Sequence, residues 1–404
     1  MDPKSESPRG AAATSLLNFD SAIWLAGFRP FFTLAFISGA LFPLLWALVF
    51  SGHLTLPDSG LTSVQWHAHE MLFGFGWAVL GGFLLTASKN WVKIRGLHGG
   101  ALAMAASLWL VERLVFVLCP LATLPAAARF AIASPFLLFV VGYVVWSLIR
   151  FRKNDNFRDN YFFIVGLPLF ILGKALILNP STFTEGYLLT IGLFRLAFAV
   201  MLERTLTQFM KNSFKVEILR NKVLDTAIKV LILASAFEAF FPSGLASVLL
   251  ALAGLLLLIR FAFWRPDLAF QKFEIGIMYV GYLGLAVHLL LEAARIWGWS
   301  LDAVGTLPLH TFTFVCMGLI IPSMMIRICQ GHTGRKLIFT GSDKIALLLM
   351  SAGIFFRLVA TQLAPQLYIL WVGLAAAGWS ACFIILGYRL IPFLWLPRID
   401  GREH

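Results

Sequence analysis

The chain has 404 residues, of which 59% are hydrophobic and only 13% are charged, and its mean hydropathy is +0.84. Soluble proteins are about 45–50% apolar and about 25% charged, so this chain has too few charged side chains to cover soluble domains of that total length. Its net charge of +12 would suggest a nucleic-acid partner in a soluble protein. Here we expect no nucleic acid, because the composition indicates that the surroundings are the lipid bilayer.

Long apolar segments recur along the chain. A helix needs about 20 apolar residues to cross about 30 Å of hydrocarbon. This rule predicts an all-α, multi-pass membrane protein with twelve transmembrane helices, comprising a short N-terminal segment (1–22), one membrane domain (23–391) and a tail (392–404). The predicted spans are 24–50, 65–87, 97–118, 122–149, 161–178, 187–203, 223–241, 245–264, 273–296, 305–326, 344–362 and 366–391.

The basic residues predict how these spans are oriented. Of the 32 lysines and arginines, 24 lie at or beside the ends of spans that would share one side with both termini, beginning with Lys4 and Arg9. The loops on the opposite side contain none. Because cytoplasmic loops are rich in Lys and Arg, we expect both termini in the cytoplasm and the protein in a bacterial inner membrane. The four cysteines form no C-x-x-C pair, so no disulfide framework or zinc ribbon is indicated.

Four histidines are predicted to share one depth near the outer ends of the spans. His67 and His69 begin the second span, His288 lies in the ninth, and His310 begins the tenth. At 1.5 Å per residue, all four fall within about 3–12 Å of the outer boundary. Ionisable groups inside a membrane usually face the bundle interior or a functional site. A single histidine there can be a packed, hydrogen-bonded residue, but imidazole is also a common ligand of iron, copper and zinc. These four histidines are therefore candidate metal or haem ligands.

The spacing of His67 and His69 limits what they do together. Residues i and i+2 of a helix point about 200° apart, so both cannot bind one metal ion on an unbroken helix. Either they serve two centres, or one is a ligand and the other is a hydrogen-bond partner. Glu70 and Met71 follow them as supporting groups, and the Met71 thioether would share a face with His67.

Other charged residues are expected at the same depth. Glu292 lies four residues after His288, where its carboxylate would orient the imidazole. Arg113 and Arg357 reach the same layer and are candidate cofactor-binding residues, because a guanidinium suits the carboxylates of a haem edge or a nearby glutamate.

A second polar group is predicted on the cytoplasmic side. Arg29 opens the first span within G-F-R-P-F-F, Arg327 ends the tenth, and His332 and Arg335 follow in G-H-T-G-R. Glycines and basic side chains together form surroundings that favour an anion. The alternative is a basic loop that touches lipid headgroups.

Three motifs together resemble the NnrS family: G-F-R-P-F-F at 27–32, W-H-A-H-E-M at 66–71 with F-G-F at 73–75, and G-H-T-G-R at 331–335. The resemblance implies an inner-membrane haem and copper protein linked to nitric oxide, in nitrosative-stress defence or denitrification. On this basis the expected cofactors are haem of type b and copper. Arg204 is followed by T-L-T-Q in this chain, where the family pattern would have a proline-containing stretch.

The layout also resembles the catalytic subunit of haem–copper oxidases, with three four-helix arcs and haem ligands on spans 2 and 10. That analogy predicts that His67 or His69 pairs with His310 across a haem. Spans 6 and 7 contain no histidine, which argues against an oxidase-type copper centre.

The leading hypothesis is a haem-dependent membrane protein that binds or metabolises nitric oxide. If it is an enzyme, it is an oxidoreductase that acts on nitric oxide. The alternatives are a twelve-span secondary transporter of a small anion or metabolite, and an accessory subunit of a respiratory complex.

Overall fold

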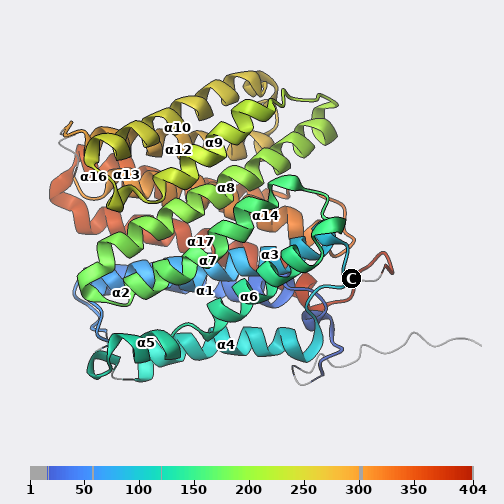
Figure 1. The fold of residues 1–404 in the computed structure, drawn as a ribbon, viewed down its shortest axis with the longest axis horizontal. Coiled ribbons are helices and arrows are strands. Elements are labelled where there is room, and N and C mark those ends of the chain that lie inside the picture. Colours follow the sequence, from blue (N-terminus) through green and yellow to red (C-terminus); the bar gives the residue numbers. More distant parts are fainter. Residues whose placement is uncertain (1–15, 17, 57–58, 120, 300–303, 403–404) are drawn as a thin grey trace, which may run out of the picture.

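The computed structural model describes residues 16, 18–56, 59–119, 121–299 and 304–402 (Figure 1). All the regular elements within these ranges are helices. The predicted cytoplasmic cations Lys4 and Arg9 lie outside the described residues.

Within the described ranges, ten helices are long and apolar enough to cross a membrane. Three of them include a π-helical element. They are Ser63–Val92, with α2 (Ser63–His69), η2 (Glu70–Gly76) and α3 (Trp77–Val92); Leu307–Gly331, with α13 (Leu307–His310), η8 (Thr311–Met317) and α14 (Gly318–Gly331); and Gly341–Leu363, with α15 (Gly341–Ile354), η9 (Phe355–Ala360) and α16 (Thr361–Leu363). The others contain α1 (Phe28–Phe50), α4 (Gly99–Leu118), α7 (Tyr161–Ile177), α8 (Phe183–Phe214), α10 (Ser243–Phe263), α12 (Phe273–Ile296) and α17 (Tyr368–Trp395).

Two predicted spans differ from this description. The segment 122–149 contains α5 (Ala126–Ile132) and α6 (Pro135–Arg150), which meet at 65°, and the described chain has eleven candidate spans if this pair counts as one. The segment 223–241 contains α9 (Lys222–Ser235), whose 14 residues rise only about 21 Å. The structure therefore supports ten or eleven candidate spans, and the full set of twelve is not confirmed.

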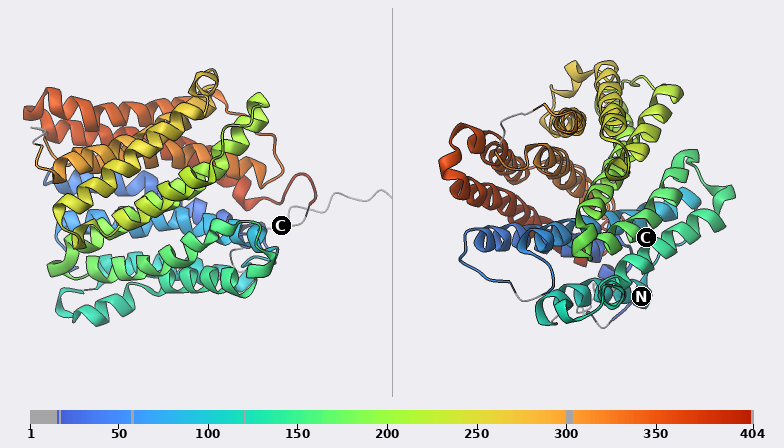
Figure 2. Two further views of the ribbon diagram at one scale, coloured as in Figure 1. Left: turned by 45° about the horizontal axis from the view of Figure 1, so that its top comes forward. Right: turned by 60° about the vertical axis from the view of Figure 1, so that its left-hand side comes forward.

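The helices lie side by side and run roughly along one direction (Figures 1 and 2). α1 packs on α17, α7 on α8, and α10 on α12. The start of α1 lies at the same end of the bundle as the end of α17, because Arg29 Nη1 donates to the carbonyls of Leu394 at 2.6 Å and Leu396 at 2.8 Å. The side that faces the cytoplasm and the division into three arcs stay predictions.

Three membrane helices are interrupted by π-helical turns. These are η2 (Glu70–Gly76), η8 (Thr311–Met317) and η9 (Phe355–Ala360). A π turn carries an extra residue, rotates the helix that follows it, and is frequent at functional sites. η2 follows His69 directly, η8 follows His310, and η9 contains Arg357. The three turns therefore reset the directions of side chains in the predicted histidine layer.

The packing of α15 against α17 supports a stability prediction. A Cβ on Gly378 would lie 2.7 Å from the Leu349 carbonyl oxygen and 3.1 Å from Gly353 Cα, whereas a Cβ on Gly373 of the same helix would meet nothing within 4 Å. We expect Gly378→Ala to lower the free energy of unfolding by about 1–3 kcal/mol, because backbone atoms must move apart. Gly373→Ala is the matched control and is expected to be neutral or slightly stabilising. Thermal unfolding in detergent measures both, and equal effects of the two variants would contradict this packing.

Candidate functional site

A cavity of about 350 Å³ lies among α1, α2, α8, η8, η9 and α17, and we call it the histidine cavity. Four predicted site residues line it: His67, Met71, His310 and Arg357. Much of the remaining wall is aromatic and includes Trp46, Phe50, Phe183, Tyr187, Phe314, Tyr368 and Trp379. The cavity therefore brings together side chains from five segments that are far apart in the sequence.

His67 enters the histidine cavity from α2. Its ring stacks on Trp46 of α1, with 4.3 Å between ring centroids and 16° between planes. Its Nδ1 atom is buried and has no hydrogen-bond partner among the described residues. Because buried polar atoms are nearly always paired, this unpartnered nitrogen makes His67 an exception among the buried polar groups beside the cavity.

His310 faces the same cavity from the residue before η8. Its Nδ1 lies 3.0 Å from the Thr306 carbonyl oxygen and 2.6 Å from the Thr306 hydroxyl oxygen. An Nδ1–H that donates to this carbonyl leaves the lone pair on Nε2, the arrangement that commonly orients a metal-binding histidine. Arg357 Nη2 lies 3.4 Å from Nε2, so a guanidinium lies beside the ligand-capable nitrogen.

His69 points to a different part of the protein, as its i, i+2 spacing from His67 predicts. Its ring lies 4.4 Å from that of Phe116 on α4, and its Nδ1 is 2.9 Å from Glu70 Oε1. Its Nε2 is buried without a partner within the described part of the chain. The histidine cavity is thus lined by His67 and His310 and not by His69.

Arg113 belongs to a buried ion network behind His69. Its Nε lies 3.2 Å from Glu70 Oε2, and its Nη2 lies 3.2 Å from Glu112 Oε2. Lys174 Nζ lies 2.8 Å from the same Glu112 oxygen. Of the two partners predicted for such an arginine, a haem edge or a glutamate, Arg113 contacts glutamates.

His288 is fully hydrogen-bonded. Its Nδ1 donates to the Pro308 carbonyl at 2.6 Å, and its Nε2 accepts from Arg195 Nε at 2.8 Å. The expected pairing with Glu292 is absent, because the Glu292 carboxylate binds Arg295 Nη2 at 2.5 Å instead. With both ring nitrogens in use, His288 joins α12 and α8 to the backbone two residues before His310.

Residues of the predicted cytoplasmic-side group hold the C-terminal segment. The His332 ring lies 5.4 Å from Phe28, and its carbonyl accepts from Arg398 Nη1 at 3.0 Å. The Arg335 guanidinium lies 4.1 Å from the Phe393 ring. The hydrogen bond from Arg398 lowers the pKa of the Asp400 carboxyl to about 2, so this pair stays ionised at neutral pH.

Arg327 lies apart from that group. Its Nη2 donates to the Glu274 carbonyl at 3.0 Å, and its guanidinium lies 4.1 Å from the Phe209 ring. The four predicted cytoplasmic-side residues thus form no common cluster: Arg29, His332 and Arg335 contact the end of the chain, whereas Arg327 contacts α12 and α8.

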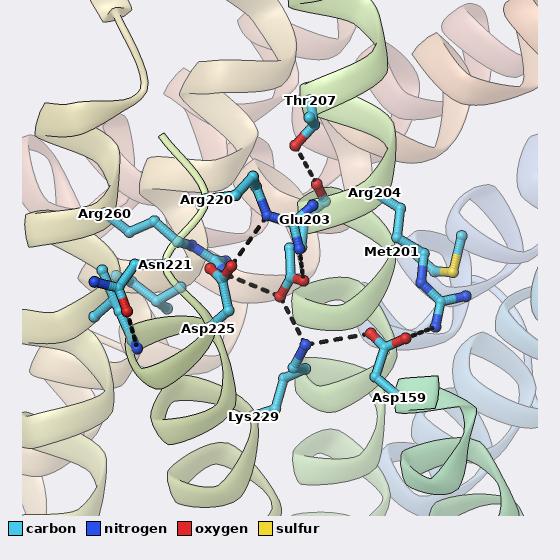
Figure 3. Close-up of polar contacts among 12 residues, drawn as sticks. Asp159, Met201, Glu203, Arg204, Thr207, Arg220, Asn221, Asp225, Lys229 and Arg260 are labelled. Atoms are coloured by element: carbon cyan, nitrogen blue, oxygen red, sulfur yellow. Dashed lines mark hydrogen bonds and ion pairs between the residues drawn. The ribbon is translucent and has the colours of Figure 1, made fainter. Parts of the chain in front are cut away.

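Sequence reasoning did not predict the ion network between α8, α9 and α10 (Figure 3). Glu203 of α8 lies at its centre, with Oε2 2.9 Å from Lys229 Nζ and 3.3 Å from Arg260 Nη1, while Oε1 accepts from Arg220. Arg260 also contacts Asp225 at 3.3 Å. Acidic residues inside apolar segments were the available signal, because a carboxylate is buried in a membrane protein chiefly where cations pair with it.

At the position where the sequence departs from the family pattern, Arg204 is held by its own partners. Its Nη2 lies 2.7 Å from Asp159 Oδ1, and its guanidinium lies 4.2 Å from the Phe157 ring and 5.2 Å from the Trp91 ring. This arginine therefore fastens α8 to the segment before α7.

The side chains available as ligands differ in how well they meet the needs of haem and of a bare metal ion. No group of three or more His, Cys, Asp or Glu side chains within the described ranges is arranged to hold a metal ion. A haem needs only one or two axial side chains, and His67 and His310 in one cavity meet that need. The histidine cavity therefore supplies the one or two side-chain ligands that a haem needs, whereas the described residues supply no group of those four types for a copper ion.

Fold and site together define a multi-pass α-helical membrane protein with a histidine-lined cavity toward one end of its bundle. The chain matches the family model described as NnrS protein over residues 22–398, and it belongs to this family. No curated protein matches it. Family membership fits a membrane protein of the nitric oxide response and gives no support to the transporter alternative.

Proposed function

We propose that this protein binds haem in the histidine cavity and binds nitric oxide there, as a haem protein of the bacterial inner membrane. The observation that carries the proposal is that His67, with an unpartnered buried nitrogen, and His310 line one cavity from separate helices. Each lies close to a π-helical turn, η2 or η8.

The residues of the cavity would hold the group in defined ways. Trp46 fixes the plane of the His67 ring by stacking, and Thr306 fixes the orientation of His310 by accepting from its Nδ1. Arg357 and Tyr368 supply polar groups suited to carboxylates at the edge of the porphyrin. Haem, when bound, would supply an iron that coordinates nitric oxide, and His67 and His310 are the residues that would hold it.

The experiment is an absorption spectrum of the purified full-length protein, with chemical haem analysis and anaerobic addition of nitric oxide. We expect a Soret band that shifts when nitric oxide is added. The proposal would be overturned if folded protein from haem-replete membranes lacked a Soret band. It would also be overturned if the position of that band did not change when nitric oxide is added.

The charge of Arg357 predicts a redox effect. A cation beside the cofactor favours the reduced, less positive iron, so Arg357→Gln is expected to lower the midpoint potential by on the order of tens of millivolts. Arg295→Gln is the matched control, because Arg295 lies outside the cavity lining and its side chain is 54% exposed. A redox titration followed in the Soret region measures both. An unchanged potential in Arg357→Gln would place the cofactor away from this arginine.

A further inference from the structure

A second cavity of about 90 Å³ lies between α3, α8 and α14, and we call it the apolar cavity. Its walls come from three inner helices and from Phe32 of α1. The rest of the lining is apolar except for Thr205 of α8.

The lining offers no free polar group to an occupant. Thr205 supplies the one side-chain hydroxyl in the lining, and that hydroxyl donates to the Met201 carbonyl at 2.8 Å. Water occupies a cavity stably when it finds two or more polar partners, whereas dry apolar cavities take up xenon or similar apolar guests. At about 90 Å³ this space is too small for a porphyrin. Its size and chemistry therefore favour a small uncharged gas molecule.

The apolar cavity lies directly beyond the histidine cavity along the same helices. Leu72 and Ile191 line the histidine cavity, whereas Gly76 and Phe194, about one turn further along, line the apolar one. A Cβ on Gly76 would lie 2.9 Å from the Phe194 ring. The Phe194 ring thus rests against the glycine backbone, about one turn from Leu72 and Ile191, which line the histidine cavity.

The apolar cavity is reachable from outside the bundle. Phe83 of α3, Met201 of α8 and Met324 of α14 line it and are only half-buried. These residues lie within candidate membrane spans, so the surroundings at this depth are hydrocarbon. Apolar gases partition into hydrocarbon from water, which gives the cavity a supply of its occupant.

We propose that the apolar cavity takes up a small uncharged gas from the lipid and passes it beside Phe194 into the histidine cavity. The uptake step depends on the lining alone. The delivery step rests on the proposed function, in which the gas is nitric oxide and the histidine cavity holds its binding partner.

Xenon binding tests the uptake step on the full-length protein without any need for haem. We expect saturable xenon binding by xenon NMR, weakened about tenfold or more in Ala197→Phe, which fills the space. Phe194→Ala enlarges the cavity and is expected to retain binding. Circular dichroism and thermal unfolding confirm that each variant is folded. Absence of saturable binding in the wild type, or unchanged binding in folded Ala197→Phe, would overturn the uptake step.

The delivery step is measured by the rate at which nitric oxide rebinds after photolysis in haem-loaded protein. We expect slower rebinding in Ala197→Phe and faster rebinding in Phe194→Ala. Equal rates in all three proteins would overturn delivery while leaving the haem site intact. Saturable xenon binding in a protein without a Soret band would instead overturn the proposed function and leave uptake standing.

Discussion

Replacing His67 and His310 together by alanine is expected to abolish haem binding and with it the Soret band. These two imidazoles are the histidines that line the histidine cavity, so the double variant leaves the iron without an imidazole ligand from that cavity. Each single variant is expected to retain less haem than the wild type and to show a shifted band, since one of the two imidazoles remains. Absorbance per protein, with haem analysis, measures the effect.

Two matched variants make this result specific. His69→Ala is expected to keep the Soret band, because His69 faces Phe116 and Glu70 and not the cavity. His53→Ala removes an exposed imidazole and is expected to change nothing. A Soret band lost in His69→Ala but kept in the double variant would assign the haem to the other face of α2.

Glu203→Gln is expected to lower the free energy of unfolding by about 3–5 kcal/mol, the usual cost of breaking a buried ion pair. Three cations contact this one carboxylate: Arg220, Lys229 and Arg260. When the Glu203 side chain no longer carries a negative charge, Lys229 and Arg260 remain buried. Their remaining acidic partners are then Asp159 and Asp225, respectively. Unfolding in mixed micelles, followed by circular dichroism, measures the loss.

Glu217→Gln is the matched control for that prediction. Glu217 pairs with Lys211 at 2.5 Å, but both side chains are largely exposed, and exposed ion pairs contribute little to stability. No measurable change is expected. A Glu203→Gln variant as stable as this control would mean that the network between α8, α9 and α10 contributes nothing net to folding.

Hydropathy predicted most helices because hydrocarbon selects long apolar segments. The segment 273–296 was predicted and corresponds to α12 (Phe273–Ile296). Hydropathy did not predict the 65° bend before α6 or the 14-residue length of α9. Both depend on where the backbone turns inside an apolar stretch, and a hydropathy window averages over such turns.

Depth along the helices placed His67, His310 and Arg357 in one layer, and all three line the histidine cavity. The same argument placed His69 and His288 in that layer, but they face other partners. Depth fixes the height of a residue and not its angle around the helix. That angle depends on neighbouring helices and on π-helical turns such as η2 and η8, for which the sequence carried no recognised signal.

The most direct test of the central claim is hyperfine spectroscopy of the iron in protein whose histidines carry a nitrogen isotope label. The account predicts coupling between haem iron and histidine nitrogen in the wild type and in His69→Ala, and its loss in the His67→Ala, His310→Ala double variant. Haem iron whose histidine coupling survives in the double variant, or folded protein with no haem iron, would contradict it.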